Sequence, residues 1–477
     1  MNIQPGSLPT EGRAKRYGLG HIEQEGHAPT LGRLVRAFVL VAAGVSGLVL
    51  GPTASQAVPS FARQTGMTCS VCHTSIPELT SFGRQFKMNG YVLSMPPDPK
   101  MALPITAFMV GGFTHTQKAQ DAPPLQSSQK TNDILSLDQF SVFYAGKIAD
   151  NLGAFAQFTY SPDAKSWSWD NTDIRWAKSG SLLGKDATFG LSLNNNPTVQ
   201  DLWATTPAWG YPQFGSAVAP QFGPPGTMLQ GTLAQTVVGL TGYSMFSNGF
   251  YTEFGGYTGL SPAMLTHLGT GDPGFQVKGF APYLRLAYSK SLSKKSTLMV
   301  GLMAMAADLK PTAAGSSGND RYVDLGFDTQ YDYSGHGYGL TLKARDIIEW
   351  QHTSGASPFS GASNPANHLN ATDISLTYYR SKWAVIGAFS RVSGSSDAGL
   401  YGANSAIGSP NSKSVSLEVN YSPWMDGGPS WDPRGNLKFG IQYIHYLQLY
   451  GGTTNFDGAG HNASDNNTVF IYAMLAF

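Results

Sequence analysis

Alternation of apolar and polar residues runs through most of the chain after Met101, and it limits the fold more than any other feature. In "SVSLEVNY" (414–421), Val415 and Leu417 fall on one face of an extended chain, and the residues between them fall on the other. The same period recurs in "DISLTYY" (373–379) and many similar stretches. A period of two with one apolar face is typical of β-strands. We therefore predict an all-β fold.

About sixteen such segments are expected, each read from its period of two. They are predicted to begin near Ile105, Leu135, Leu152, Ser168, Ala187, Thr232, Phe250, Tyr283, Ser296, Arg321, Gly337, Asp373, Trp383, Ser414, Leu437 and Asn467. Short connections such as 381–382 alternate with long ones such as 197–230 and 450–466. Outer-membrane barrels have short turns at the periplasmic rim and long loops outside. The prediction is a transmembrane outer-membrane β-barrel of antiparallel strands, residues 101–477, with both termini of the mature chain in the periplasm.

The last strand supports this prediction. The chain ends "NTVFIYAMLAF", an alternating segment that closes on Phe477. A terminal aromatic residue on such a strand resembles the signal that outer-membrane assembly machinery recognises. The alternative is a soluble array of β-sandwiches, which would bury the apolar face between two sheets. That alternative requires neither the asymmetric loops nor the terminal aromatic residue.

The N-terminus is typical of an export signal. An apolar run from Ala37 to Leu50 follows Arg36, and a small-residue stretch ends at Ala57. We predict a signal peptide over 1–57, with cleavage after Ala57. The alternative is a membrane anchor, but about 14 apolar residues are too few to span a bilayer comfortably. The mature chain is therefore expected outside the inner membrane.

Charge and cysteine content exclude two classes of protein, those that bind nucleic acid through a basic surface and those held together by a disulfide framework. Lys and Arg (31) nearly balance Asp and Glu (30), so no basic surface indicates nucleic-acid binding. Charged residues make up 13% of the chain, against about 25% in typical soluble domains. The chain has two cysteines, which cannot form a disulfide framework for its size.

Those two cysteines lie in "CSVCH", where Cys69, Cys72 and His73 match the attachment site of haem c. Each thiol can add to one vinyl group of the porphyrin, and His73 can supply the proximal nitrogen to the iron. A thioredoxin-like redox pair would need a βαβ surround, which the sequence does not show. A zinc site would need two further ligands. We predict one covalently attached haem c.

A single helix is expected after the motif. Residues 75–78 ("SIPE") form a capping box with proline in the first turn, and 89–90 ("NG") supply a stop. Leu79, Phe82 and Phe86 recur on one face. That face is expected to pack on the porphyrin, which here would be the core.

The sixth iron position has several candidates. Met95 follows the helix, where the chain can fold back, and His115 lies on the first predicted strand. Met88 falls on the helix face opposite Leu79. Single methionines and histidines are more often structural residues than metal ligands. The alternative is that the sixth iron position has no protein ligand.

Residues 58–100 are expected to form a monohaem cytochrome c-type segment, which is too short to bury a haem with a core of its own. The segment is therefore expected to plug or cap the barrel lumen and to use the barrel wall as part of its pocket. Arg63, Arg84 and Lys87 are candidates to pair with haem propionates, with a solvated surface role as the alternative.

The order of motifs resembles the outer-membrane monohaem cytochrome–porin fusion family of Fe(II)-oxidising bacteria. The resemblance is carried by "VPSFARQTG" (58–66), "CSVCHT" (69–74), "PEL" (77–79), "FGRQFK" (82–87), "NGY" (89–91) and "FTHTQK" (113–118). The family implies one c-type haem on a porin-like barrel that accepts electrons from Fe(II) outside the cell. Carried over, Cys69, Cys72 and His73 hold the haem.

The expected function is electron transfer through the outer membrane, as an Fe(II):cytochrome c oxidoreductase. The haem would take electrons from extracellular Fe(II) or another donor and pass them to a periplasmic soluble cytochrome or cupredoxin. Predicted inward polar residues either attract Fe(II) or form ion pairs with the plug; they are Arg285, Asp324, Asp328, Lys343, Arg345, Asp373, Glu418 and Lys438. The alternative is a diffusion porin with a structural or redox-sensing haem plug. A haem or siderophore transporter would need about 22 strands.

Overall fold

The protein is described by a computed structural model. The structure describes residues 59–93, 104–119, 132–161, 165–219, 223–312, 318–353 and 360–477. The predicted signal peptide (1–57) and Met95 lie outside these ranges.

Seventeen antiparallel strands form one sheet in the described part of the chain. They are β1 (Ile105–Thr116), β2 (Asp133–Ala149), β3 (Leu152–Ser161), β4 (Ser166–Leu182), β5 (Lys185–Asn194), β6 (Val237–Phe246), β7 (Phe250–Gly259), β8 (Phe275–Val277), β9 (Ala281–Ser293), β10 (Ser296–Pro311), β11 (Asp320–Gly335), β12 (Tyr338–His352), β13 (Ala366–Arg380), β14 (Trp383–Gly394), β15 (Ser412–Tyr421), β16 (Asn436–Gln448) and β17 (Thr468–Ala476).

The sheet closes on itself because β1 pairs with both β2 and β17. The short strand β8 pairs with the last residues of β10, and β9 pairs with the rest of β10. β8 therefore occupies the same position in the sheet as β9. Sixteen strands therefore go round the barrel, as predicted, and no sheet edge is left open. Closure satisfies the backbone hydrogen bonds that a bilayer cannot.

All sixteen predicted strands are present, and two of them begin more than two residues from the predicted start. β6 begins at Val237 rather than near Thr232, because the preceding residues form turns and Gln235 has a positive φ of 58°. β13 begins at Ala366 rather than near Asp373, because its first residues pair with the outer end of β12.

The two rims of the barrel differ in their connections. The short-turn rim carries the tight turns 150–151, 183–184, 247–249, 294–295, 336–337 and 381–382, and also the longer loop 422–435. The long-loop rim carries, among others, 195–236, 260–280, 395–411 and 449–467. Phe477 ends the chain at the short-turn rim, where its amide and carbonyl bond the backbone of Ala107 at 3.0 and 2.9 Å.

The exterior is apolar between two aromatic belts. Outward residues such as Phe254 and Leu417 are 69% and 54% exposed. Exposed tryptophans lie near both ends of the strands; among them are Trp167 and Trp350 toward the long-loop rim, and Trp176 and Trp383 toward the short-turn rim. An apolar band between aromatic girdles is the exterior of a lipid-embedded barrel. The chain is thus a multi-pass β-barrel of the outer-membrane type, as predicted.

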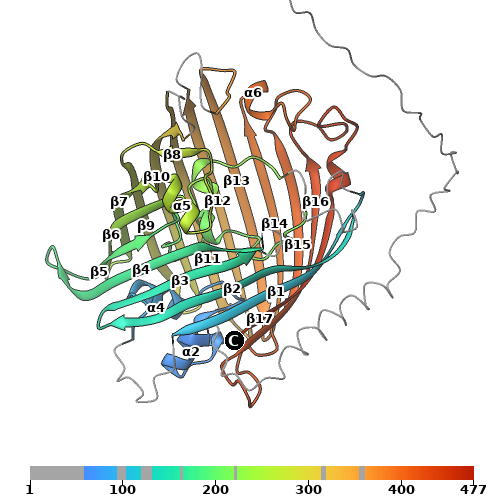
Figure 1. Cartoon of the computed structure of the whole chain (residues 1–477). Helices are drawn as coiled ribbons and strands as arrows, with labels where there is room; N and C mark the ends of the chain where they lie inside the picture. The colour runs from blue at the N-terminus through green and yellow to red at the C-terminus, as the bar shows by residue number, and fades with distance from the viewer. Residues whose placement is uncertain are drawn as a thin grey trace, which may run out of the picture.

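The described helices are short; they are α2 (Pro59–Thr65), α3 (Cys69–Cys72), α4 (Ser81–Met88), α5 (Pro262–His267) and α6 (Ala398–Tyr401), with the 3₁₀ turns η1 (Pro207–Trp209), η2 (Met228–Gln230) and η3 (Ala463–Asn466). None of them has the length and apolarity to cross a bilayer. Figure 1 shows α2 and α4 at the same end of the barrel as the C-terminus. We call residues 59–93 the plug.

The predicted helix start at 75–78 is wrong. α4 begins at Ser81, and its N-cap is Thr80, whose hydroxyl accepts a hydrogen bond from the amide of Gly83 at 3.1 Å. The preceding residues fold instead into a hairpin-like turn, in which His73 forms a β-bridge with Leu79. The predicted stop is confirmed, because Asn89 is the C-cap and Gly90 has a positive φ of 72°.

Loop 195–236, which we call the inner loop, folds into the lumen. Its first twelve residues, 195–206, are all buried. The inner loop contacts distant parts of the wall: the amide of Leu229 donates to Asp324 on β11 at 2.9 Å, and Gln442 on β16 donates to the Phe214 carbonyl at 3.1 Å.

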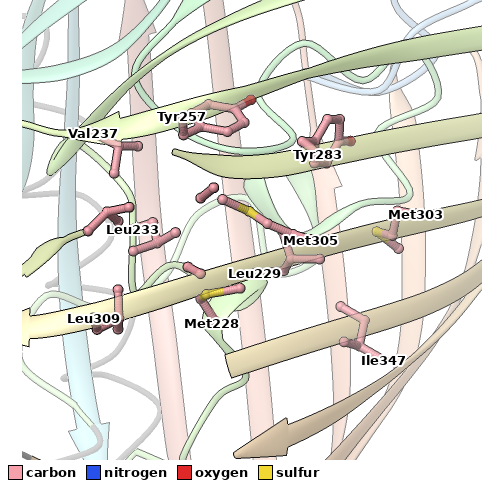
Figure 2. Close-up of a cluster of buried hydrophobic side chains, with 13 residues drawn as sticks. Met228, Leu229, Leu233, Val237, Tyr257, Tyr283, Met303, Met305, Leu309 and Ile347 are labelled. Carbon is pink, nitrogen blue, oxygen red and sulfur yellow. The ribbon is translucent and has the colours of Figure 1, made fainter. Parts of the chain in front are cut away.

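Part of the inner loop forms a hydrophobic core inside the barrel. Met228, Leu229 and Leu233 pack on inward side chains of the wall, among them Met303 and Met305 of β10 (Figure 2). Water-filled lumens are polar. Here packed apolar side chains occupy that region.

Candidate cofactor site

Polar contacts dock the plug against several parts of the wall. Tyr91 donates a hydrogen bond to Asp173 on β4 at 2.6 Å. At the opposite side of the plug, the Lys438 ammonium of β16 donates to the Ile76 carbonyl at 3.0 Å. The plug therefore lies within the ring of strands, as predicted.

Ion pairs add to this docking. Glu78 of the plug pairs with Lys343 on β12, and its second oxygen accepts a hydrogen bond from Gln213 of the inner loop at 2.8 Å. Arg84 pairs with Asp332 on β11 at 3.1 Å. Wall, inner loop and plug thus share one polar network.

The remaining predicted inward polar residues contact one another or the inner loop. Arg285 pairs with Asp328, Arg345 with Asp373, and Lys438 with Glu418 at 3.8 Å. Asp324 lies directly opposite Glu349 in the sheet and accepts from the inner loop. The prediction of ion pairs with the plug therefore holds for Lys343 alone, because the other pairs join residues of the wall and Asp324 faces a second carboxylate. Within the described ranges, no three His, Cys, Asp or Glu side chains form a metal-binding group.

A cavity of about 370 Å³ lies between the plug, the inner loop and the wall. Its volume falls in the range of roughly 300–1,000 Å³ found for cofactor sites. The apolar part of the lining comes from all three elements; it includes Phe61 and Leu79 of the plug, Trp209 and Phe214 of the inner loop, and Phe108, Phe143, Phe155 and Met474 of the wall. No one segment could form this pocket alone.

Cys69, Cys72 and His73 all line the cavity. Both cysteines are free thiols, and α3 holds them on one helical turn. Burial raises the pKa of both thiols, that of Cys72 to about 11. In the haem-free chain both cysteines are therefore protonated near neutral pH.

The imidazole of His73 is oriented by a backbone carbonyl. Its Nδ1 lies 3.1 Å from the Pro77 oxygen. A carbonyl only accepts, so Nδ1 carries the proton and Nε2 keeps its lone pair. Burial also lowers the pKa of His73, which favours the neutral ring. A neutral imidazole fixed through its other nitrogen is the form that binds a metal.

One buried amide in the cavity lies beside the Cys69 thiol. Asn436 on β16 is 1% exposed, and among the described residues its side chain has no partner other than this thiol, which bonds weakly. Buried amides usually make all their hydrogen bonds, because each unmade one costs about 1–3 kcal/mol. A bound group with polar atoms would satisfy Asn436. The pocket, the two thiols and the neutral imidazole together fit a covalently attached haem.

The candidates for the sixth iron position separate. Met95 lies outside the described residues. His115 is near the long-loop end of β1, where its Nδ1 bonds Asp133 at 2.8 Å. Phe108, the residue of β1 that lines the cavity, is seven positions away, about 23 Å along a strand. The structure does not bring His115 to the cavity.

Met88 packs away from the cavity, against the cluster around Trp203. Two methionines that the sequence analysis did not consider do line it: Met67, just before the motif, and Met474 on β17. Met474 could have been found from the alternation of inward and outward residues in the last strand. The outward face of β17 carries Ile471 and Leu475, so Met474 points inward.

Comparison with known proteins adds general resemblance in shape. No protein-family model and no curated protein matches the chain. Among solved structures, it is similar to the outer membrane channel DcaP of Acinetobacter baumannii (12% identity, 78% of this chain and 96% of that chain, TM-score 0.43). It is also similar to the anion-selective porin from Comamonas acidovorans (14%, 78% and 99%, 0.42) and to OmpT of Vibrio cholerae (11%, 78% and 96%, 0.40). Identities and TM-scores this low say nothing about function.

Proposed function

We propose that this chain is an outer-membrane electron-transfer protein with one covalently attached haem c. The observation that carries the proposal is the cavity at Cys69, Cys72 and His73, which the plug, the inner loop and the wall enclose together. Haem, when bound, supplies an iron that accepts and releases one electron. In this proposal Cys69 and Cys72 tether it, and His73 offers Nε2 to the iron.

The residues of the chain contribute position rather than bond-making chemistry. Pro77 holds the His73 ring at a fixed angle through its carbonyl. Thr80 caps α4 and also donates its hydroxyl to the Val71 carbonyl at 2.7 Å, which ties α4 to the CSVC turn. A rigid site is favourable for electron transfer, because little structure has to rearrange when the charge changes.

The contents of the lumen favour passage of electrons over passage of solutes. The buried stretch 195–206 crosses the lumen, and the apolar core shown in Figure 2 fills another part of the lumen. A diffusion porin needs a continuous polar channel. The barrel form by itself is compatible with the second candidate, a porin whose haem plug is structural or senses redox state.

The direction of transfer follows from the two rims. Short turns of outer-membrane barrels face the periplasm, and the plug and the C-terminus both lie at the short-turn rim. On this orientation the haem would deliver electrons to a periplasmic cytochrome or cupredoxin. The donor would act from the long-loop side, and extracellular Fe(II) is the donor that the family resemblance implies. The corresponding activity is that of an Fe(II):cytochrome c oxidoreductase.

The test uses the full chain expressed with a cytochrome-maturation system and purified in detergent. Haem should remain attached after denaturation, and a Cys69→Ala, Cys72→Ala double variant should lose it. Addition of Fe(II) should convert the oxidised to the reduced haem spectrum within seconds. Proteoliposomes carrying the same protein should exclude small sugars.

The outcomes separate the candidates. A chain with no covalent haem overturns the electron-transfer proposal entirely. Attached haem that only dithionite reduces, in liposomes that admit sugars, supports the porin. If the attached haem is reduced by another extracellular reductant but not by Fe(II), the electron-transfer proposal stands with a different donor.

A further inference from the structure

Lys87 differs from the other lysines of the lumen. It lies near the end of α4, is 7% exposed, and donates to the backbone carbonyls of Val199 and Asp201 at 2.7 and 2.8 Å. No carboxylate lies within 4 Å of its ammonium among the described residues, whereas Lys343 and Lys438 each have one. Burying an ammonium without a counter-charge is costly.

The same side chain lines the cavity. Of the described residues around the cavity, Lys87 is the only lysine or arginine. Its Nζ also lies 5.1 Å from the ring centre of Trp209, another lining residue. Two carbonyl bonds use two of the three ammonium protons, so one donor is left for a further partner.

The charges around Lys87 do not remove the deficit. Arg175 and Asp173 on β4, Asp201 on the inner loop and Glu253 on β7 all act on it. Asp173 is bonded to Arg175, and Asp201 faces Arg285 at 3.5 Å. In the haem-free chain, burial first and Arg175 second lower the pKa of Lys87 to about 7.

The other two candidates from the sequence are placed elsewhere. Arg84 pairs with Asp332 and bonds the Leu79 carbonyl, and Arg63 donates to the Ile105 carbonyl at 3.2 Å. Neither lines the cavity. The structure therefore distinguishes Lys87 among the three.

We propose that Lys87 is the residue that receives a propionate carboxylate of the haem, as the cationic anchor of the cavity. This inference rests on the proposed function, because it requires haem in the pocket. A carboxylate beside Lys87 would complete its hydrogen bonds and balance its charge. The ion pair would keep both groups charged across neutral pH.

The pairing predicts how the midpoint potential depends on pH. In the wild-type holoprotein the ion pair should not titrate between pH 6 and 8, so the potential should stay flat there. In Lys87→Met the propionate would be buried without a counter-charge, which raises its pKa toward neutral. The potential should then fall as pH rises, by up to about 59 mV per pH unit for one proton per electron.

The experiment is a spectroelectrochemical titration of purified holoprotein from pH 5 to 9. Lys87→Arg keeps the charge and should retain the flat profile. Lys118→Met removes an exposed lysine at the far end of β1, and it should also behave as wild type. A Lys87→Met profile as flat as that of wild type, at the same potential, overturns the proposal.

A wild-type measurement alone also tests it, in case Lys87→Met does not fold. The midpoint potential of the wild type could instead show a pH-dependent step near pH 7 that shifts in Lys87→Arg. Such a step would mean that Lys87 is unpaired, and it would refute the pairing. Failure of the proposed function looks different, because haem would be absent from every variant. Haem that is present but not reduced by Fe(II) leaves the titration fully interpretable.

Discussion

The hydroxyl of Tyr91 is a suitable place to test how the plug is held. Tyr91 is 7% exposed and donates to Asp173 on the wall at 2.6 Å. Tyr91→Phe removes this bond and keeps the ring, which stacks on Phe61 with centres 5.4 Å apart. Asp173 would still accept from Arg175 and Ser192 at 2.7 and 2.8 Å, so its charge is not stranded.

The expected loss is that of one hydrogen bond to a charged acceptor, about 1.5–3 kcal/mol. The loss weakens the docking of the plug but not the pairing of the barrel strands. If the plug opens locally, its exchange with solvent accelerates by the same free energy. At 1.4 kcal/mol per factor of ten, that is roughly 10- to 150-fold.

Hydrogen exchange followed by mass spectrometry on the holoprotein measures this directly. Amides of α4 should exchange faster in Tyr91→Phe, and amides of the barrel strands should not change. Tyr443→Phe is the matched control, because Tyr443 is 42% exposed on β16. Wild-type protection of α4 in Tyr91→Phe would refute the assignment of Tyr91 as an anchor.

Three further changes probe other contacts. A Cβ at Gly83 would lie 2.3 Å from the Cys72 carbonyl oxygen, so Gly83→Ala should separate α4 from the motif and sharply reduce haem attachment, measured as haem per protein. Glu78→Gln leaves Lys343 buried without its counter-charge, at a cost of about 3–5 kcal/mol, and should accelerate exchange in the plug; adding Lys343→Met should restore much of the protection. Burial alone would raise the pKa of Asp397, but hydrogen bonds around α6 lower this pKa to about 2. The stability that the Asp397 carboxylate provides is therefore complete above its usual pKa of 3.8 and is lost as pH falls through 2. Pepsin should cut loop 395–411 of the wild type only near pH 2, and that of Asp397→Asn already at pH 4.

Each of these has an outcome that contradicts it. Gly215 has open space around it, and Gly215→Ala is the control for Gly83; equal haem content in both variants rejects the close approach. Exchange in the Glu78→Gln plug equal to that of wild type would mean that the ion pair does not contribute. Identical pepsin sensitivity of Asp397→Asn and wild type at pH 4 would reject the role of Asp397.

The barrel was predictable because its signals are local. Strand parity is read from neighbouring residues, and a membrane barrel needs one apolar face on every strand. Each of the sixteen strands was found for this reason, with the largest shifts at β6 and β13. Those two boundaries depend on the inner loop and on pairing at the long-loop rim, which are not local.

The helix after the motif shows the opposite case. The sequence at 75–78 has every feature of a capping box, yet the chain there forms a turn. Ser75 is buried and bonds Asn420 on β15 at 3.4 Å, and the Pro77 carbonyl accepts from His73. Tertiary contacts thus overrode a local preference of modest energy.

The sequence by itself determined the closed β-barrel and the three residues of the motif, because parity and spacing are properties of adjacent positions. Only the tertiary structure decided what surrounds the motif: the inward fold of the inner loop, Asn436 beside Cys69, Met474 in the lining, and Lys87 with no carboxylate within 4 Å in the described part of the chain. Those residues come from segments as distant in sequence as Lys87 and Met474, and a contact over such a separation depends on how the whole ring of strands closes. No local pattern records that closure.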